Sequence, residues 1–527
     1  MATRIKTGAL SGIDGLAVVV EVDICRGLPG FHLVGLPNAE VKESRERVLA
    51  ALRNSGLAPP PGKITVNLAP AGVRKQGASY DLAIAVGVLA ATGRGGAAPG
   101  VLDESLFLGE LSLFGELRPV RGLLAIVSTA RERGERRVVV PADQVREARL
   151  VAGIDVVGAR TLQQVVDWWR TGRCPEPSAA PGDDHAGTAG GGTGGAAPPA
   201  TGEAAVRTLA EDLTGQPLVR KAAVVAATGG HDLLLVGPPG TGKTRLARLL
   251  ARLQPPLDPE QGLEVTRIHS AAGTLKTAAI MTERPFRAPH HTITRAGLIG
   301  GGSSLRPGEA TLAHRGILFL DELTEFRPAV LDVLREPMEE GTIAVCRGSG
   351  HVTYPADFQL VAAMNPCRCG YLGSRQRACR CSPADQTRYL NRLSGPLLDR
   401  FDLFVEVGAW EGPFLARGAR SAVADTAGGG GDWRRRPDAT AMARARRLLA
   451  TMRTTRDPAS RLGDLEPAGV RLLEQMRLSA GLSLRAVGRC LRVAATMAAL
   501  DGSRLITRAH VAEALEFRRR NALQAIG

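Results

Sequence analysis

Three short, largely apolar runs stand out between residues 230 and 365, and each ends in a segment of glycine, proline or polar residues. The runs are LLLV at 233–236, GILFL at 316–320 and FQLVAAM at 358–364. Short apolar runs of this kind are typical of strands that are buried in a sheet. After the first run, apolar residues recur at helical spacing, at Leu246, Leu249 and Leu250. The pattern predicts a strand–loop–helix unit within an α/β domain.

The pattern of apolar residues changes after this region. Two β-prone runs in residues 341–356 flank the sequence GSG, which predicts a β-hairpin. Towards the C-terminus, amphipathic helices are predicted at 468–476, 483–500 and 506–517. These helices indicate a helical domain of the kind that closes over a nucleotide as a lid.

Two stretches that are poor in large apolar side chains divide the chain. Residues 181–202 are rich in Gly, Ala and Pro, and residues 416–432 contain the run AGGGGD, so neither can bury enough surface to order itself. We therefore expect a multidomain α/β protein. Its parts are an N-terminal α+β domain at 1–175, a linker at 176–205, an α/β core at 206–408 with a cysteine-rich loop at 365–382, a variable loop at 409–437 and a helical domain at 438–527.

Composition narrows the class of partner and the cellular setting. The chain has 67 Lys and Arg against 52 Asp and Glu, and its net charge of +15 favours a polyanion such as nucleic acid. A solvated, arginine-rich surface would give the same charge without any partner. Acidic residues near the N-terminus argue against a signal peptide, and the longest apolar stretch, Leu82–Thr92, is about half of what a bilayer span needs. We expect a cytoplasmic protein with reduced thiols and no membrane partner.

The segment after the first apolar run has the residues for binding a nucleotide. Its sequence, GPPGTGKT, has glycines that let successive amides turn toward a phosphate chain. Lys243 is expected to reach the β- and γ-phosphates of ATP, and the Thr244 hydroxyl is expected to coordinate Mg²⁺. The candidate nucleotide-binding residues here are Gly237, Pro238, Pro239, Gly240, Thr241, Gly242, Lys243 and Thr244.

The other two strands end in residues that suit phosphoryl transfer. Asp321 is expected to hold the Mg²⁺ shell, and Glu322 is expected to polarise the attacking water. Asn365, directly after the third strand, is placed to orient that water. Arg400 follows a short apolar helix, and Arg485 lies at the start of another helix. The sequence therefore predicts Mg²⁺-dependent ATP hydrolysis.

These features, in this order, resemble the AAA+ ATPases, and longer motifs are similar to the magnesium-chelatase-like ComM/YifB family. The motifs are RPFRAPHHTITRAGLIGGGSSLRPGEATLAHRGILFLDEL, FQLVAAMNPCRCGY and SGPLLDRFDLFVEV, and the resemblance extends from about residue 5 to the C-terminus. It implies that Asn365 is sensor 1 and that Arg485 is the sensor 2 arginine. It also implies that Arg400 is an arginine finger that stabilises phosphoryl charge on ATP bound by a neighbouring subunit.

The resemblance also implies a task for the ATPase. It implies a homo-oligomeric ring, expected to be a hexamer, that acts as a DNA helicase or translocase. The ring would drive branch migration of recombination intermediates during natural transformation, with single-stranded or branched DNA as its partner. The alternative is a chelatase-like ATPase that remodels a protein complex. Magnesium insertion into porphyrin is not expected, because the true chelatase needs separate subunits.

Residues 1–170 resemble the Lon-protease-like (S5-like) domain of this family. Ser79 falls on or near the position of the Lon nucleophile, but Leu124 occupies the position of the lysine that would deprotonate it. Without that base Ser79 is an ordinary hydroxyl, so we do not expect a protease. Arg74 and Lys75, in the loop VRKQG, are either solvated residues or contacts to DNA phosphates.

The predicted hairpin lies just before Asn365, where related chelatase and helicase ATPases insert a hairpin into the central pore. Arg347 and His351 flank its turn, and Arg347 is a candidate contact to DNA phosphates. A surface hairpin without a ligand is the alternative. The pair His290–His291 has no spaced carboxylate or cysteine partner for a metal, so we interpret it as part of a structural or DNA-facing loop.

Four of the eight cysteines lie in the hydrophilic loop after Asn365, in the pattern C-x-C-x9-C-x-C. These are Cys367, Cys369, Cys379 and Cys381. The two pairs can converge on one tetrahedral centre, and four thiolates favour a structural Zn²⁺. C-x-C is tighter than the usual C-x2-C spacing, and an iron–sulfur cluster or free thiols are the alternatives. A metal here would hold the segments of Asn365 and Arg400 in fixed relation, without a catalytic role.

Overall fold

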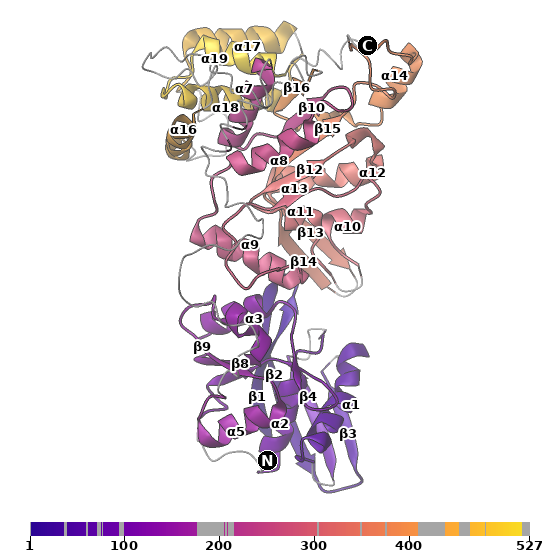
Figure 1. Cartoon of the computed structure of the whole chain (residues 1–527), viewed down its shortest axis with the longest axis vertical. Coiled ribbons are helices and arrows are strands. Elements are labelled where there is room, and N and C mark those ends of the chain that lie inside the picture. The colour runs from indigo at the N-terminus through magenta and orange to yellow at the C-terminus, as the bar shows by residue number, and fades with distance from the viewer. Residues whose placement is uncertain are drawn as a thin grey trace, which may run out of the picture.

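The computed structural model describes most of the chain (Figure 1). The described residues are 2–35, 39–58, 62–70, 75, 77–93, 100–175, 205, 208, 216–302, 305–347, 350–374, 377–408, 438–452, 464–479 and 481–518. The predicted linker, apart from residue 205, and the whole predicted variable loop lie outside this description. Within the described residues, no helix combines the length and the apolar character that crossing a bilayer requires.

The N-terminal region folds around a seven-stranded mixed sheet. Its strands are β1 Thr3–Ser11, β2 Asp14–Cys25, β3 Gly30–Val34, β4 Lys63–Ala69, β5 Ser105–Phe107, β8 Arg137–Pro141 and β9 Asp155–Ala159, in the order β3-β4-β2-β1-β5-β8-β9. The helices are α1 Ala39–Asn54, α2 Asp81–Ala91, α3 Leu123–Glu132, α4 Val145–Ala148 and α5 Leu162–Thr171, and β6 Glu110–Leu111 pairs with β7 Leu117–Arg118. On β1, Ile5 approaches α2 whereas Gly8 meets α3. Because side chains alternate along a strand, these two helices cover opposite faces of the sheet.

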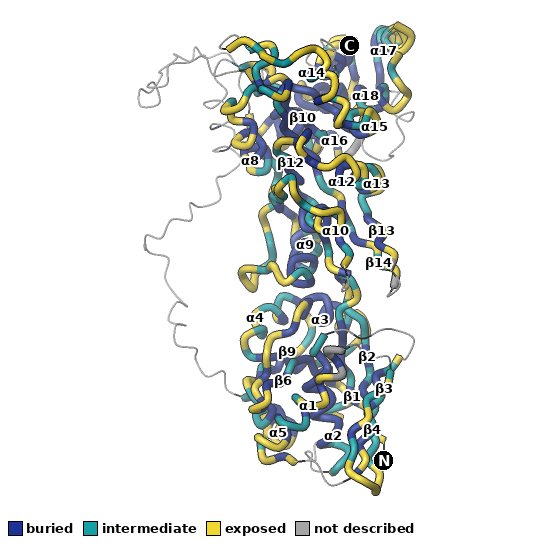
Figure 2. The backbone as a smooth tube through the Cα atoms, turned by 90° about the vertical axis from the view of Figure 1, so that its right-hand side faces the viewer, coloured by how far each residue is buried: buried dark blue, intermediate teal, exposed yellow. Residues whose placement is uncertain are grey.

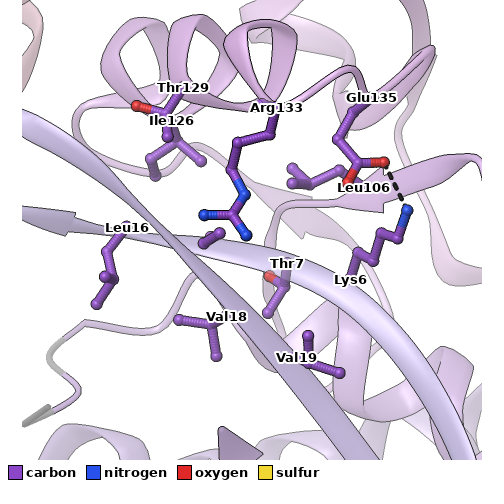
Figure 3. A pocket seen from close by; sticks show the side chains of 13 residues that line it. Lys6, Thr7, Leu16, Val18, Val19, Leu106, Ile126, Thr129, Arg133 and Glu135 are labelled. Carbon is purple, nitrogen blue, oxygen red and sulfur yellow. Dashed lines mark hydrogen bonds and ion pairs between the residues drawn. The ribbon is translucent and has the colours of Figure 1, made fainter. Parts of the chain in front are cut away.

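A cavity of about 110 Å³ lies in this region between β1, β2 and α3 (Figure 3). Leu16 and Ile126 are among its apolar walls, and the guanidinium of Arg133 extends over it. An ion pair of 2.9 Å between Lys6 and Glu135 closes one side. None of the residues that line this cavity is among the candidates from the sequence.

The central region is built on a five-stranded parallel sheet. Its strands are β10 Leu233–Val236, β11 Phe286–Arg287, β12 Ile317–Leu320, β15 Gln359–Met364 and β16 Leu403–Glu406, in the order β11-β12-β15-β10-β16. Every residue of β10, β12 and β15 is buried, and these strands coincide with the three apolar runs of the sequence. The helices are α7 Pro217–Gly229, α8 Lys243–Leu253, α9 Pro259–Ala272, α10 Arg295–Ile299, α11 Glu309–Leu312, α12 Pro328–Leu331, α13 Arg335–Glu340, α14 Pro383–Leu390 and α15 Gly395–Leu398.

Two further units flank the parallel sheet. The predicted hairpin is present as β13 Thr342–Arg347 and β14 Gly350–Pro355, which form a two-stranded sheet of their own. The predicted helical region contains α16 Ala439–Met452, α17 Pro467–Ser479, α18 Leu484–Leu500 and α19 Arg508–Glu516. Figure 1 shows these helices at one end of the central sheet and the hairpin at the other end, beside the N-terminal domain. In Figure 2 the buried segments follow the middle of both domains.

Candidate ATP-hydrolysis site

The candidate catalytic residues gather at one edge of the central sheet. β15 lies between β10 and β12 and runs parallel to each, so the three strands end on the same side. Directly after their last residues come Gly237, Asp321 and Asn365. The sheet therefore brings together the three segments that the sequence analysis singled out.

Glycines shape the loop between β10 and α8. Gly240 and Gly242 have φ values of +79° and +83°, in the left-handed region that glycine adopts without strain. A Cβ on Gly237 would lie 2.2 Å from the carbonyl oxygen of Val407, so a larger residue does not fit there. α8 begins directly after this loop, at Lys243. The free amides at a helix N-terminus attract anions, so this loop is suited to hold phosphate groups.

Lys243 points back over the loop that precedes it. Its ammonium donates to the carbonyl oxygens of Gly237 at 2.7 Å and Pro238 at 2.8 Å, and to Oδ1 of Asn365 at 3.3 Å. Burial lowers the pKa of Lys243, and the negative charge of Asp321 opposes that change. The cation is thus held beside the candidate sensor by groups that phosphate oxygens can replace.

Thr244 and Asp321 meet between the loop and β12. The Thr244 hydroxyl donates to Oδ2 of Asp321 at 2.7 Å, and the amide of Glu322 donates to Oδ1 of Asp321 at 2.9 Å. Hydroxyl, carboxylate and phosphate oxygens are the ligands that Mg²⁺ prefers. These two residues fit a Mg²⁺ ion that is bound together with a nucleotide.

Glu322 contacts His291, which the sequence analysis interpreted as part of a structural or DNA-facing loop. Nδ1 of His291 lies 3.3 Å from Oε2 of Glu322, and Glu322 adopts a left-handed backbone conformation with φ +51°. The His291 ring is fixed in turn by the ring of His290, at 4.1 Å between centroids, and by the edge of Phe326. The pair of histidines therefore lies against the candidate catalytic carboxylate. Nothing in the local sequence pattern shows a contact across some thirty residues.

The two candidate arginines lie together on a carboxylate that the sequence analysis missed. Arg400 is 7% exposed, and its Nη2 lies 2.5 Å from Oε1 of Glu339 on α13. Nη1 of Arg485 lies 3.2 Å from the same oxygen. Burial lowers the pKa of Arg400, and Glu339 opposes that change. The described contacts of both arginines are therefore to Glu339 and its surroundings, whereas Lys243 contacts the phosphate-binding loop.

Asp402, two residues after Arg400, ties the helical region to the central sheet. Its Oδ1 accepts hydrogen bonds from Arg489 at 3.1 Å and Arg492 at 3.0 Å, and both arginines are on α18. Burial disfavours the charge of Asp402, but His231 and the arginines hold its pKa below the usual range. Burial and the charge of Asp402 raise the pKa of Asp232 to about 7. The segment that carries Arg400 is thus fixed to the helical region.

The four cysteines of the loop after Asn365 converge as predicted. Their sulfur atoms all lie within 4.8 Å of one another. Three of the separations are 3.4 Å for Cys367–Cys369 and 3.6 Å each for Cys367–Cys379 and Cys369–Cys379. With zinc–sulfur bonds of about 2.3 Å, the edges of a tetrahedral site are about 3.8 Å. The four residues Cys367, Cys369, Cys379 and Cys381 could therefore hold one metal ion.

This cysteine loop packs against the catalytic segments. A Cβ on Gly370, which has φ +84°, would lie 2.8 Å from Cδ of Pro239 in the phosphate-binding loop. Beyond the last cysteine, the hydroxyl of Tyr389 on α14 contacts the Thr324 hydroxyl at 2.7 Å, just after Glu322. The loop thus touches the phosphate-binding loop, and α14, which follows it, contacts the segment just after Glu322.

The structure describes some of the candidate DNA contacts and not others. Lys75 is 1% exposed, and its ammonium donates to the carbonyl oxygen of Pro70. Burial lowers the pKa of this ammonium. An ammonium inside the fold cannot reach a DNA phosphate, so we do not carry Lys75 into the proposed DNA surface. Arg74 and the side chain of Arg347 lie outside the described part of the chain, whereas His351 is exposed on β14.

Ser79 lies just before α2, inside the N-terminal domain. Its hydroxyl donates to the carbonyl oxygen of Gly8 at 3.0 Å. Leu124, at the position where the resemblance expects a lysine, is buried in an apolar cluster with Leu123 and Val127. The geometry of Ser79 is that of a structural hydroxyl that satisfies a strand carbonyl.

Three family descriptions match successive parts of the chain. "Subunit ChlI of Mg-chelatase" matches residues 20–144, "Magnesium chelatase, subunit ChlI" matches 210–413, and "Magnesium chelatase, subunit ChlI C-terminal" matches 435–518. The chain is also 40% identical to YifB of Escherichia coli, over 98% of this chain and 96% of YifB. It is 38% identical to the competence protein ComM of Haemophilus influenzae, over 97% and 96% of the two chains.

A local similarity concerns Lon protease 2 of Bacillus subtilis. The identity is 30% over 128 residues, which is 24% of this chain and 22% of the protease. The Lon-like resemblance is therefore supported over part of the chain only.

Proposed function

We propose that this chain, which belongs to the magnesium-chelatase-like AAA+ ATPase family that includes YifB and ComM, is an ATP-driven ring motor that acts on DNA. The observation that carries the proposal is the set of Lys243, Thr244, Asp321, Glu322 and Asn365, which lie together at one sheet edge. The DNA substrate is supported by the net charge of +15 and by the similarity to a competence protein. Branch migration of recombination intermediates is the task that we propose.

Hydrolysis follows from the geometry of these residues. Lys243 exchanges the carbonyls of its own loop for the β- and γ-phosphates of ATP. Mg²⁺, when bound at Thr244 and Asp321, neutralises charge on the same phosphates. Glu322 polarises the attacking water, and Asn365 orients it. His291 contacts one carboxylate oxygen of Glu322 and leaves the other for the water, so we assign it as a positioning residue.

Arg400 is proposed to act as an arginine finger for ATP bound by the neighbouring subunit, and Arg485 is proposed to act as the sensor 2 arginine. The two share Glu339, and one carboxylate cannot neutralise two cations, so a net positive charge remains for a phosphoryl group. Arg400 is 7% exposed, so its guanidinium must leave Glu339 before it can reach a phosphate of the next subunit. A ring, proposed to be a hexamer, would bring Arg400 to the next phosphate-binding loop.

Structural Zn²⁺ is the metal that we propose for the four cysteines. Sulfur separations close to those of a tetrahedral zinc site support this choice, as does a donor set made only of thiols. Because the loop contacts Pro239 and continues into α14, the metal would fix the position of the phosphate-binding loop relative to Asn365. All four ligand positions are protein sulfur atoms, so the site has no catalytic role.

The β13–β14 hairpin is proposed to grip DNA. Cys346, His351 and Thr353 lie on its exposed face, and Arg347 and Gly350 pair at its turn. A cation at such a turn can follow the phosphate backbone without reading the bases. Cycles of ATP hydrolysis would then move the hairpin along DNA.

A synthetic four-way DNA junction with homologous arms tests this function. The wild-type protein should convert the junction into separated duplexes when ATP is present, and a non-hydrolysable ATP analogue should not support the reaction. The matched control is Glu322→Gln, which should bind the junction without moving it. An active ATPase that moves no branched or partly single-stranded DNA would favour remodelling of a protein complex instead.

A further inference from the structure

The tip of the β1–β2 hairpin reaches from the N-terminal domain to the β13–β14 hairpin. The tip consists of residues 11–14, where Gly12 alone has a positive φ, +67°, as a tight two-residue turn requires. A Cβ on Gly12 would lie 2.4 Å from Cγ1 of Val352. Ile13 is 8% exposed and is buried in the same apolar cluster as Tyr354. The tip therefore packs directly on β14, and Figure 1 shows the strands of the two hairpins next to each other.

The hairpin that receives this tip has two different faces. Ile343, Val345 and Tyr354 are buried on one face, whereas the opposite face, with His351 and Thr353, is exposed. Tyr354 also donates its hydroxyl to the carbonyl oxygen of Leu305, and burial raises the pKa of Tyr354 to about 12. The tip thus covers part of the apolar face and leaves the face with His351 and Thr353 open.

Polar contacts fasten the tip and its domain to α9. Nη2 of Arg267 lies 2.7 Å from Oδ1 of Asp14, at the base of the tip. The Ser270 hydroxyl donates to Oε1 of Glu147 at 2.5 Å, and the carbonyl oxygen of Ser270 accepts from the amide of Gly122 at 3.3 Å. Three elements of the N-terminal domain therefore hold one helix of the ATPase domain.

We propose that the β1–β2 tip is a built-in support that sets the position of the β13–β14 hairpin, so that the N-terminal domain couples DNA contact to ATP hydrolysis. The coupling rests on the proposed DNA function; the support itself rests on the contacts alone. A two-stranded hairpin is marginally stable by itself, and among the described residues no third strand pairs with β13–β14. Its order must therefore come from what covers its apolar face. The N-terminal domain, in which Leu124 occupies the position of the Lon lysine, has a mechanical role in this proposal.

Hydrogen exchange of the full-length protein tests the support without reference to DNA. Ile13→Asp places a charge in the contact, and the amides of β13 and β14 should exchange at least ~10-fold faster than in the wild type. The matched control is Leu28→Asp, the same type of change at a side chain that is 90% exposed in the same domain. Wild-type exchange of both strands in a folded Ile13→Asp protein would overturn the support.

A second pair of variants exchanges the charges of Asp14 and Arg267, and it tests the same contact if Ile13→Asp does not fold. Asp14→Arg should speed exchange in β13 and β14 by bringing two arginines together, and adding Arg267→Asp should slow it again. Failure of the double variant to restore any protection, with both proteins folded, would contradict the proposed support.

The coupling has a separate readout. Ile13→Asp should keep the ATPase rate measured without DNA and lose DNA stimulation by at least ~5-fold. If the wild type itself shows no DNA stimulation, the proposed function fails while the exchange experiment still decides on the support. Faster exchange with undiminished stimulation would overturn the coupling and leave the support standing.

Discussion

The two ends of the ATPase domain are built in opposite ways. At the nucleotide end, polar side chains from separate segments of the chain contact one another, as Thr244 does with Asp321 and His291 does with Glu322. At the hairpin end, an apolar face packs into the core of the ATPase domain and is covered in part by the tip of the N-terminal domain, while the opposite face is exposed. The difference shows that the residues around Lys243 meet within one domain, whereas the β13–β14 hairpin also contacts a second domain, on which we propose that its position depends.

The largest expected effect separates binding from hydrolysis at the nucleotide end. Lys243→Ala should abolish ATP binding, because the ammonium contacts phosphate in the ground state. Glu322→Gln should keep ATP binding and lower kcat by about 10²–10⁴-fold, because the carboxylate acts only when water attacks. Equilibrium binding of a fluorescent nucleotide and steady-state turnover measure the two effects. Near-normal turnover in Glu322→Gln would remove that residue from its assigned role.

The next prediction concerns whether Arg400 of one subunit completes the ATP site of another. Arg400→Ala should lower kcat by about 10³-fold or more if Arg400 stabilises transferred phosphoryl charge. Mixing it with Lys243→Ala protein should restore part of the activity, because some interfaces then pair an intact loop with an intact arginine. If the rings are shown to contain both variants and ATPase activity is still not restored, the result would count against action of Arg400 on a neighbouring subunit.

The cysteine loop offers a test of how the nucleotide end is held. Anaerobically purified protein should contain about one zinc per chain, and Cys379→Ser with Cys381→Ser should lose it. The melting temperature should then fall by several degrees, since the metal orders a loop with few apolar residues. Cys346→Ser, at an exposed thiol outside the cluster, is the matched control. A metal-free wild type with the same melting temperature and ATPase rate as the double variant would contradict the zinc proposal.

The smallest expected effect is at the hairpin end. Arg347→Ala should weaken DNA binding about equally for all sequences and reduce the slope of log K against log salt by about one unit. Arg4→Ala, at a side chain that is 78% exposed on the N-terminal sheet, should leave the slope unchanged. Binding titrations at several salt concentrations measure the effect. Unchanged affinity and slope in Arg347→Ala would move the DNA contact to another surface.

Local patterns in the sequence predicted the strands and the loop–helix unit that carry the candidate ATP site. The apolar runs are β10, β12 and β15, and Gly237, Asp321 and Asn365 follow them, because strand, loop and helix signals lie within a few residues of one another. The convergence of the four cysteines also follows from their spacing. These features depend on short stretches of chain and on the common edge of a parallel sheet.

The rest depends on contacts that no local pattern encodes. Glu339 meets Arg400 and Arg485 across 61 residues or more, and His291 meets Glu322 through a loop whose path is set by packing. The charge of Lys75 suggested a surface residue, but the fold buries it. Ile13 and Tyr354 belong to different domains and share one apolar cluster, and hydrophobic periodicity cannot predict which domains pack together.

DNA-stimulated ATPase activity is the most direct test of the central claim, that ATP hydrolysis in this protein serves movement on DNA. Steady-state turnover of the full-length wild type would be measured without DNA, with duplex DNA, and with single-stranded and branched DNA at equal nucleotide concentration, with Glu322→Gln as the blank for contaminating ATPases. Our account predicts that single-stranded or branched DNA raises the rate several-fold, at least ~5-fold by the usual size of such coupling. A turnover rate that is the same with and without every DNA would contradict it.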